Sequence, residues 1–287
     1  MRIICLAGLI CAVSTPAYAA EEAQDSRWEM GISGGTAMIG DSDDQSYIAG
    51  SVTREFGDAY IGIAASFTEP SATQGLLRTV PARTQQITVF GGIGLNAISI
   101  DGRIALGRRK FDTENLGSDD TPVAVNSSGQ IFGTGLTLTY DIPVGDNGFF
   151  SPSLSADYYS VDIGRLATAP NGRLFTFEER EDGVSGSLAL SYVHLFGDSA
   201  AHSAGPNIAI VASSNSTVFS PGTAGERVAQ LTAIRDTPGQ SDVWMEVGGS
   251  ASFGLSDELR LSLSATQTLG FVGPEATSFS AGLSASF

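Results

Sequence analysis

Acidic side chains offer the most evident possibility of chemistry in this sequence. They gather in three groups: Asp41, Asp43 and Asp44; Asp112, Glu114, Asp119 and Asp120; and Glu178, Glu179, Glu181 and Asp182. Carboxylates enrich cations locally and can contact Ca²⁺ through their oxygens. The DSDD run at Asp41 lacks the glycine and the ligand spacing of an EF-hand loop, so solvated loops are the simpler interpretation. We therefore expect an electronegative mouth without a metal site, formed by loop residues Asp41, Asp43, Asp44, Asp119, Asp120, Glu178 and Glu179.

Catalytic motifs are missing from the chain. Its two histidines are His194, which alternates with apolar residues, and His202, which falls in an expected turn at residues 197–204. No G-x-S-x-G, H-E-x-x-H or phosphate-binding loop is present. A hydrolase or other enzyme is the alternative, and it would depend on these histidines. Both lie at the short-turn end of their segments, whereas the catalytic sites of barrel hydrolases lie toward the outer side. We expect no enzymatic activity and no cofactor.

Four charged residues fall on the polar face of segments in which apolar and polar residues alternate. They are Arg103, Asp157, Glu246 and Arg260. Inside a barrel such residues either tune ion selectivity or pair to brace the wall, and the sequence leaves both options open.

The one basic run is Arg108-Arg109-Lys110. Alternation along a strand sends Arg108 and Lys110 to the face opposite Arg109. The outward pair either meets anionic lipid phosphates or is an ordinary hydrophilic strand end, and the two interpretations are equally compatible with the residues.

The elements that would position these residues are strands. Apolar and small or polar residues alternate with period two, and helical periodicity is almost absent after residue 26. We expect twelve strands, at residues 27–39, 47–56, 59–67, 84–95, 98–111, 128–142, 149–161, 182–196, 205–217, 241–255, 259–271 and 278–287. A turn at Asn96-Ala97 is preferred to one at Asp101-Gly102, because both flanking strands then reach membrane length.

The connections alternate between short and longer ones. Short turns are expected around residues 57–58, 96–97, 143–148, 197–204 and 256–258, and the intervening connections are longer. Bacterial outer-membrane barrels have short periplasmic turns and long extracellular loops. A soluble β-sandwich is the main alternative, but its exposed faces usually carry many lysines and glutamates, and this chain has a single lysine, Lys110.

The N-terminus has the organisation of a secretory signal peptide. A basic Met1-Arg2 precedes a short apolar run, which ends in Ala17-Tyr18-Ala19. We expect cleavage after residue 19 and a single domain over residues 20–287. Both cysteines lie in the expected leader, so the mature domain needs another source of stability, which closure of a sheet would supply.

Charge excludes one class of partner. The sequence has 31 Asp plus Glu against 15 Lys plus Arg. Nucleic-acid binding requires clustered positive charge, so we expect no nucleic-acid partner.

The C-terminus carries the most specific signal. In SFSAGLSASF, apolar side chains alternate up to a terminal Phe287, with Phe279, Gly282 and Leu283 before it. This stretch resembles the C-terminal recognition signal of Gram-negative outer-membrane β-barrel proteins. The resemblance implies an antiparallel up-and-down transmembrane β-barrel in the outer membrane, with the barrel assembly machinery, outer-membrane lipid and lipopolysaccharide as partners. In size it is most similar to twelve-stranded barrels, including autotransporter translocators, although only residues 20–26 precede the first expected strand and no passenger is expected.

Together these features lead to a functional expectation. We expect a porin-like passive channel for small neutral or cationic solutes. The alternative is a structural or surface-interaction barrel that uses its long loops and does not conduct. The sequence does not determine the oligomeric state.

Overall fold

The molecule is an antiparallel β-barrel. The computed structural model describes residues 26–39, 45–69, 78–80, 82–111, 128–168, 170–172, 174–197, 201–216, 218–219, 233–234, 241–270 and 275–287. The wall consists of β1 (Trp28–Ile39), β2 (Gln45–Phe56), β3 (Ala59–Thr68), β5 (Ala82–Leu95), β6 (Ile98–Phe111), β7 (Ser128–Tyr140), β9 (Gly148–Thr168), β10 (Leu174–Phe196), β11 (His202–Ser213), β14 (Asp242–Gly254), β15 (Leu259–Leu269) and β16 (Ala276–Ser286). Short accessory strands are β4 (Arg78–Thr79), β8 (Ile142–Val144), β12 (Val218–Phe219) and β13 (Ala233–Ile234). Within these ranges no helix is long and apolar enough to cross a membrane.

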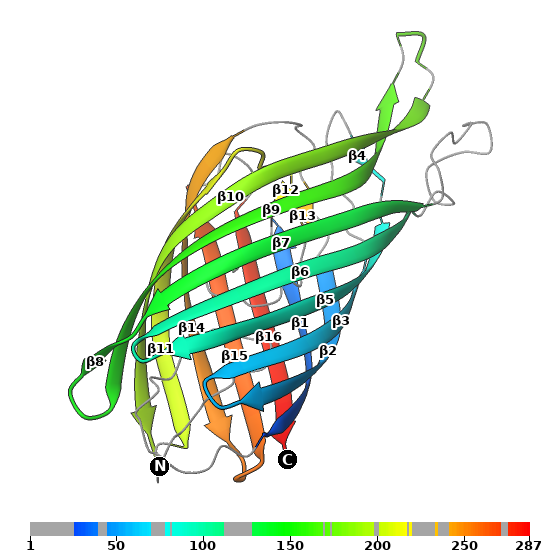
Figure 1. Cartoon of the computed structure of the whole chain (residues 1–287). Coiled ribbons are helices and arrows are strands. Elements are labelled where there is room, and N and C mark those ends of the chain that lie inside the picture. Colours follow the sequence, from blue (N-terminus) through cyan, green and yellow to red (C-terminus); the bar gives the residue numbers. More distant parts are fainter. Residues whose placement is uncertain are drawn as a thin grey trace.

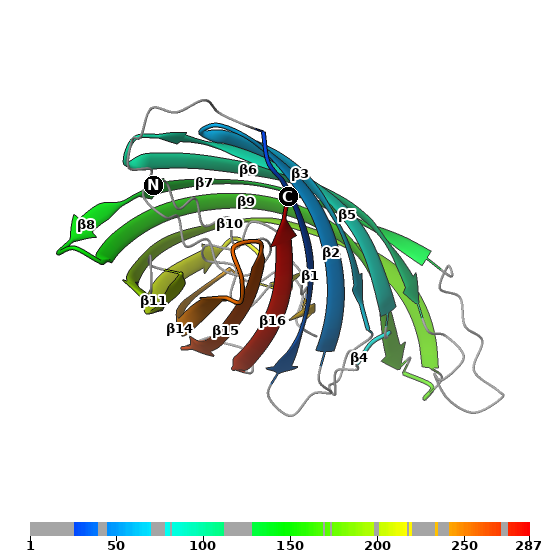
Figure 2. The same ribbon diagram turned by 90° about the horizontal axis from the view of Figure 1, so that it is seen from below.

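Each wall strand pairs with its sequence neighbours, and the ring closes between the first and last strands (Figures 1 and 2). β1 pairs with β16 over eleven residue pairs, from Glu29↔Ser286 to Ile39↔Ala276. The terminal residue takes part: Trp28 N donates to Phe287 O at 3.0 Å, and Phe287 N donates to Trp28 O at 2.9 Å. Closure satisfies the backbone groups that a sheet edge would leave exposed to lipid. The expected barrel of twelve wall strands is confirmed.

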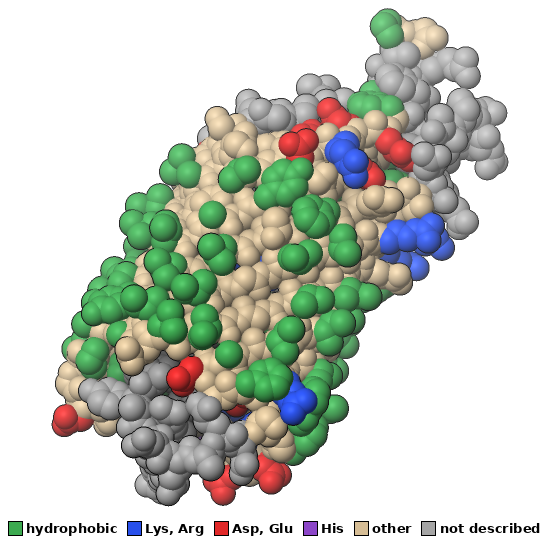
Figure 3. Space-filling view, viewed as in Figure 1, with side chains coloured by type: hydrophobic (Ala, Val, Ile, Leu, Met, Phe, Trp, Pro, Cys, Tyr) green, Lys and Arg blue, Asp and Glu red, His purple; other side chains and the backbone are tan. Residues whose placement is uncertain are grey.

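The two faces of the wall divide as the alternation predicts. Outward positions carry large exposed apolar side chains, such as Ile63, Leu106 and Leu188. Figure 3 shows these side chains spread over the wall, with charged residues concentrated toward its two ends. Such a belt is stable in hydrocarbon and unstable in water, because it forms a continuous exposed apolar surface.

The expected turn at Asn96-Ala97 is confirmed. Asn96 lies between β5 and β6 with a φ of 57°, whereas Asp101 and Gly102 lie within β6. Asparagine tolerates this left-handed conformation better than most residues, which suits it to a tight hairpin.

The expected loop at residues 162–181 is wrong. β9 continues to Thr168 and β10 begins at Leu174, so the two strands form a hairpin that rises beyond its neighbours (Figure 1). The extension is paired throughout, from Leu174↔Thr168 to Arg180↔Asp162. Its described outward residues Asp162, Glu178 and Arg180 are polar because this part of the hairpin stands above the apolar belt, so alternation of polarity does not mark it as a strand.

A segment of the β3–β5 connection also joins the wall. β4 pairs with the upper part of β9, at Arg78↔Leu166 and Thr79↔Arg165. Val80 N donates to Gly164 O at 2.7 Å, and Val80 packs with Ala82 and Phe111. This connection therefore covers the edge of β9 above the end of β7.

Candidate functional site: the lumen

The inward face of the wall is lined mainly by serine, threonine, alanine and glycine. Small side chains such as Ser51, Thr53 and Thr88 lie on this face and are buried. Aromatic residues interrupt the small lining: Phe90 packs against Ala64 and Tyr60. Part of the lumen is therefore filled by aromatic rings. The expectation of a lining of serine, threonine and glycine did not include them.

An ion pair joins two strands that are not neighbours. The Arg103 Nη2 of β6 lies 2.6 Å from the Asp157 Oδ1 of β9, and β7 runs between them. Gly135 of β7 is opposite both residues in the register. A Cβ at Gly135 would stand 1.8 Å from the Asp157 Oδ1 and 3.1 Å from the Arg103 Nε. The glycine thus leaves the space through which the two side chains meet.

The same arrangement occurs on the other side of β6. The Tyr60 hydroxyl of β3 donates to the Asp101 Oδ1 of β6. Gly92 of β5 is opposite both residues. A Cβ at Gly92 would lie 2.3 Å from the Asp101 Oδ1. Each of these side-chain contacts over a glycine, here called a glycine-spanning bridge, ties together three consecutive strands of the wall.

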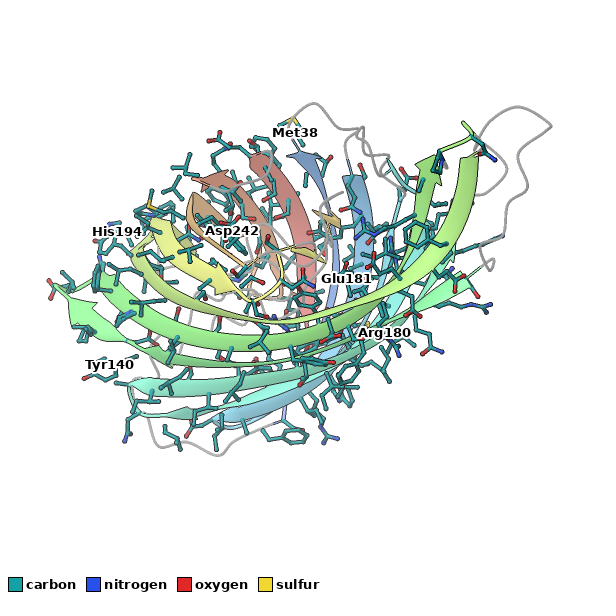
Figure 4. The ribbon with its side chains drawn as sticks, turned by 90° about the horizontal axis from the view of Figure 1, so that it is seen from above. Met38, Tyr140, Arg180, Glu181, His194 and Asp242 are labelled. Carbon is teal, nitrogen blue, oxygen red and sulfur yellow. The ribbon has the colours of Figure 1, made fainter. Side chains whose placement is uncertain are left out.

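A buried charge cluster occupies the extended hairpin. Arg165 is fully buried; its Nε lies 2.6 Å from the Glu179 Oε2 and its Nη2 lies 3.1 Å from the Glu181 Oε1. Asn215, after β11, donates from Nδ2 to the Glu181 Oε2 at 2.7 Å. Figure 4 shows Glu181 directed into the barrel, whereas its neighbour Arg180 lies on the outside. The cluster joins β9, β10 and the end of β11 at the outer end of the lumen.

The other two expected lumen charges, Glu246 and Arg260, lie apart from the Arg103–Asp157 pair. Glu246 is buried and accepts a hydrogen bond from the Trp244 Nε1 at 3.0 Å. Arg260, near the short-turn end of β15, donates to the Ser252 Oγ at 3.1 Å. All four expected inward charges therefore lie on the inward face, but only Arg103 and Asp157 meet.

The fixed charges of the described inward face favour one sign. The arginines are Arg103, Arg109, Arg165 and Arg260, and the carboxylates are Glu29, Glu55, Asp101, Asp141, Asp157, Glu179, Glu181, Asp242 and Glu246. Carboxylates are present at both ends of the lumen, since Asp101 and Asp141 lie near short turns and Asp242 begins β14 at the opposite end. A surplus of carboxylates attracts cations and repels anions.

Only two of the seven residues expected to form the acidic mouth lie among the described residues. Asp41, Asp43, Asp44, Asp119 and Asp120 lie outside the described residues, as does the expected signal peptide at residues 1–19. Glu178 and Glu179 were expected in a loop, and this is wrong: both lie in β10, with Glu178 outward and exposed and Glu179 inward.

The histidines take outward positions at the short-turn end. His194 is exposed on β10. His202 was expected in a turn, but it is the first residue of β11, with its ring between Phe196 and Phe253 at centroid distances of 5.5 and 5.9 Å. Among the described residues, no group of three or more histidine, cysteine, aspartate or glutamate side chains could hold a metal ion.

The terminal segment lies in the wall as its alternation predicts. Phe279, Leu283 and Phe287 face outward and are exposed, and Gly282 is buried on the inward face. Their role as an assembly signal stays a prediction.

Several residues of the lumen were not predicted from the sequence. Phe90 and Tyr60 could have been found from strand parity, because both fall on the polar face of their strands. Arg165 lay in an expected loop, and its only signal was the spacing of Glu179 and Glu181, which puts both carboxylates on one face of a strand.

Comparison with known proteins supports this architecture. The model of the autotransporter β-domain family matches residues 29–169. The β-domain of the Bordetella autotransporter BrkA is similar to this chain, with a TM-score of 0.60 and 14% identity over 92% of this chain and 100% of that one. The translocator domain of NalP from Neisseria meningitidis gives a TM-score of 0.56 and 9% identity, over 91% of this chain and 88% of that one.

A further structural neighbour is described as a channel. An outer-membrane channel from Pseudomonas putida gives a TM-score of 0.52 and 12% identity, over 96% of this chain and 100% of the channel. A comparison with curated proteins finds no match. At these identities the neighbours establish the fold. The closed barrel and its apolar belt identify the chain as an outer-membrane β-barrel protein located in the Gram-negative outer membrane, and residues 29–169 are similar to the autotransporter β-domain family.

Proposed function

We propose that this barrel is a passive channel for small neutral or cationic solutes. The observation that carries the proposal is the inward face, where a polar, closed wall holds more carboxylates than arginines. The apolar belt keeps the wall in the bilayer, while the hydroxyls and amides of the lining can replace part of the hydration of a passing solute.

The filled parts of the lumen support a restriction to small solutes. Phe90 and Tyr60 project from adjacent strands of one side of the wall, with ring centroids 6.3 Å apart. The Arg165 cluster occupies the outer end of another side. Side chains thus narrow the lumen at two levels, and a twelve-stranded barrel leaves modest room to begin with. The proposal assigns no catalytic step to the barrel.

Planar-bilayer recording tests the proposal. Protein whose folding has been verified by heat-dependent gel mobility should give discrete current steps, with a reversal potential in a KCl gradient that shows cation preference. The Ser264→Trp variant places a bulky ring in the lumen and should lower the conductance. The matched Leu263→Trp variant changes the adjacent, lipid-facing residue, which is exposed on the outer face, and should leave the conductance unchanged. Absence of current from folded protein, or preference for anions, would refute the channel.

A second candidate is a barrel that contacts other molecules at the cell surface. The observation that favours it is the β9–β10 hairpin, which is paired up to Leu174↔Thr168 and projects beyond the neighbouring strands (Figure 1). Replacing residues 163–179 by a two-residue turn should abolish such contacts while the barrel still folds. Unchanged binding of cells carrying the shortened protein to surfaces or partners would rule this candidate out.

A further inference from the structure

We propose that the outer surface of β1–β6 binds the lipid A anchor of lipopolysaccharide, with its phosphate on a basic cluster and an acyl chain in an apolar groove below. The cluster, here called the basic rim, consists of Arg83, Arg108 and Lys110. The inference rests on the location in the outer membrane and does not depend on the channel.

The basic rim is a concentration of positive charge on an acidic protein. Arg83 of β5 lies directly opposite Lys110 of β6, and Gln85 lies opposite Arg108. All four side chains face outward and are exposed. Like charges directly opposite each other destabilise a sheet unless an anion lies between them. The formal net charge of the chain is −16, so this local surplus of cations opposes the overall balance.

No carboxylate in the described part of the chain forms an ion pair with the rim. The described partner of Arg108 is the Ser128 Oγ, which accepts a hydrogen bond from Nη2 at 3.0 Å. Glu69 follows β3 at the same end of the wall and makes no ion pair with the three cations. The outward Arg180 of β10 differs, because its Nε lies 3.2 Å from the Asp162 Oδ1.

The basic rim borders a pocket of about 440 Å³. Its lining includes Arg83, Arg108, Lys110, Gln85 and Ser128, together with the ring of Phe67. Figure 3 shows arginine and lysine side chains gathered where the outer ends of β5, β6 and β7 lie. This level of the wall corresponds to the headgroup region of the outer leaflet, since the long connections and the tall hairpin are at the same end.

An apolar groove of about 920 Å³ continues from this pocket toward the middle of the membrane. Phe67, Gln85 and Arg108 line both spaces, so the two are contiguous. The groove lies two to four residues below the rim, or about 7–13 Å at the rise of a strand. That depth matches the first part of an acyl chain whose headgroup phosphate sits on the rim.

One row of paired outward residues explains the shape of the groove. Across five strands it reads Ile32, Gly50, Ala65, Ile87 and Leu106. Gly50 and Ala65 form a low floor, and Ile32 and Ile87 form the walls on either side. A Cβ at Gly50 would meet nothing closer than 3.8 Å, so the floor is low because the residues are small and not because neighbours cover it.

The combination favours lipid A over other anionic lipids. Two arginines and a lysine offer more positive charge than a single phosphodiester needs, and lipid A carries phosphomonoesters together with several acyl chains. Arginine binds phosphate oxygens through paired N–H donors, which suits it to this role.

Native mass spectrometry of the folded full-length barrel in detergent, titrated with lipid A, tests the proposal. Each cation near a charged lipid surface contributes about fivefold in affinity, so the Arg83→Gln/Arg108→Gln/Lys110→Gln variant should bind about 100-fold more weakly. The Gly50→Leu/Ala65→Leu variant fills the groove and should also weaken binding, while the rim stays intact. Arg180→Gln removes an outward cation that is already paired and should bind as the unchanged protein does.

Two further lipids separate charge from acyl chains. Dephosphorylated lipid A should bind far more weakly than lipid A, and phosphatidylglycerol should bind less tightly than lipid A. Equal binding of lipid A by the rim variant, or equal binding of dephosphorylated lipid A or phosphatidylglycerol by the unchanged protein, would overturn the proposal. Bilayer conductance, recorded on the same samples, reports on the channel separately, so either proposal can fail alone.

Discussion

The Arg103–Asp157 pair allows a direct measurement of how a glycine-spanning bridge contributes to the wall. Its atoms are 2.6 Å apart, and the two side chains are 12% and 19% exposed. Removing one partner of a fully buried pair costs about 3–5 kcal/mol, whereas an exposed pair contributes about 0.2–1 kcal/mol. Since this pair is largely but not fully removed from water, we expect a coupling energy of about 1–3 kcal/mol between the two residues.

A double-mutant cycle isolates this energy. The Arg103→Gln, Asp157→Asn and double variants would be folded into lipid vesicles and unfolded with urea at equilibrium. The more exposed Arg180–Asp162 pair, with side chains 59% and 25% exposed, provides the reference cycle, for which we expect a coupling below about 1 kcal/mol. If the effects at Arg103 and Asp157 add to within about 0.5 kcal/mol, the bridge does not brace the wall and the structural reasoning is wrong.

Three further predictions follow from the lumen and the closing strand. Gly135→Ala should destabilise the barrel by about 1–3 kcal/mol in urea unfolding, because the added Cβ would displace the bridging carboxylate. Gly133→Ala, on the same face of β7, should be tolerated, because the nearest atom to its added Cβ is 3.8 Å away. Equal losses of stability in the two variants would contradict the steric argument. Glu246→Gln keeps an acceptor for Trp244 but removes a lumen charge, so the reversal potential in a KCl gradient should move toward zero, and an unchanged value would show that this carboxylate does not affect permeation. Phe287→Ala should reduce the amount of barrel in isolated outer membranes, while refolding of the purified variant in detergent stays intact; a normal amount in the membrane would argue against a role in assembly.

The face of the strand on which each side chain lies could be predicted from the sequence, because it depends only on the two-residue period of a strand. Arg109 was expected inward between two outward cations, and it is buried, with Nη1 donating to Asp162 O at 2.8 Å. Arg108 and Lys110 are exposed on the other face, also as expected. Such inferences hold wherever one face of the strand meets lipid, since the apolar belt then marks that face without ambiguity.

The β9–β10 hairpin shows where the same reasoning fails. Above the belt the outward face turns polar at Arg180 and Asp162, while the inward face mixes the buried Ile163 with the Arg165–Glu179 ion pair. Period-two polarity disappears although the backbone pairing continues. The hairpin is stabilised there largely by buried ion pairs and backbone hydrogen bonds, which leave no hydrophobic pattern, and the apolar contribution of Ile163 is a single residue that does not set a period.

By itself, the sequence determined that the chain is a closed twelve-stranded wall, which side of it the residues of the expected strands face, and that the closing strand ends on Phe287. Those properties depend on alternation and on the spacing of turns, which are local. Only the tertiary structure decided which inward residues meet. Arg103 finds Asp157, and Tyr60 finds Asp101, because the register of three strands places a glycine between each pair. The relative shift of neighbouring strands is set by the closure of the whole ring, and no local pattern in the chain encodes it.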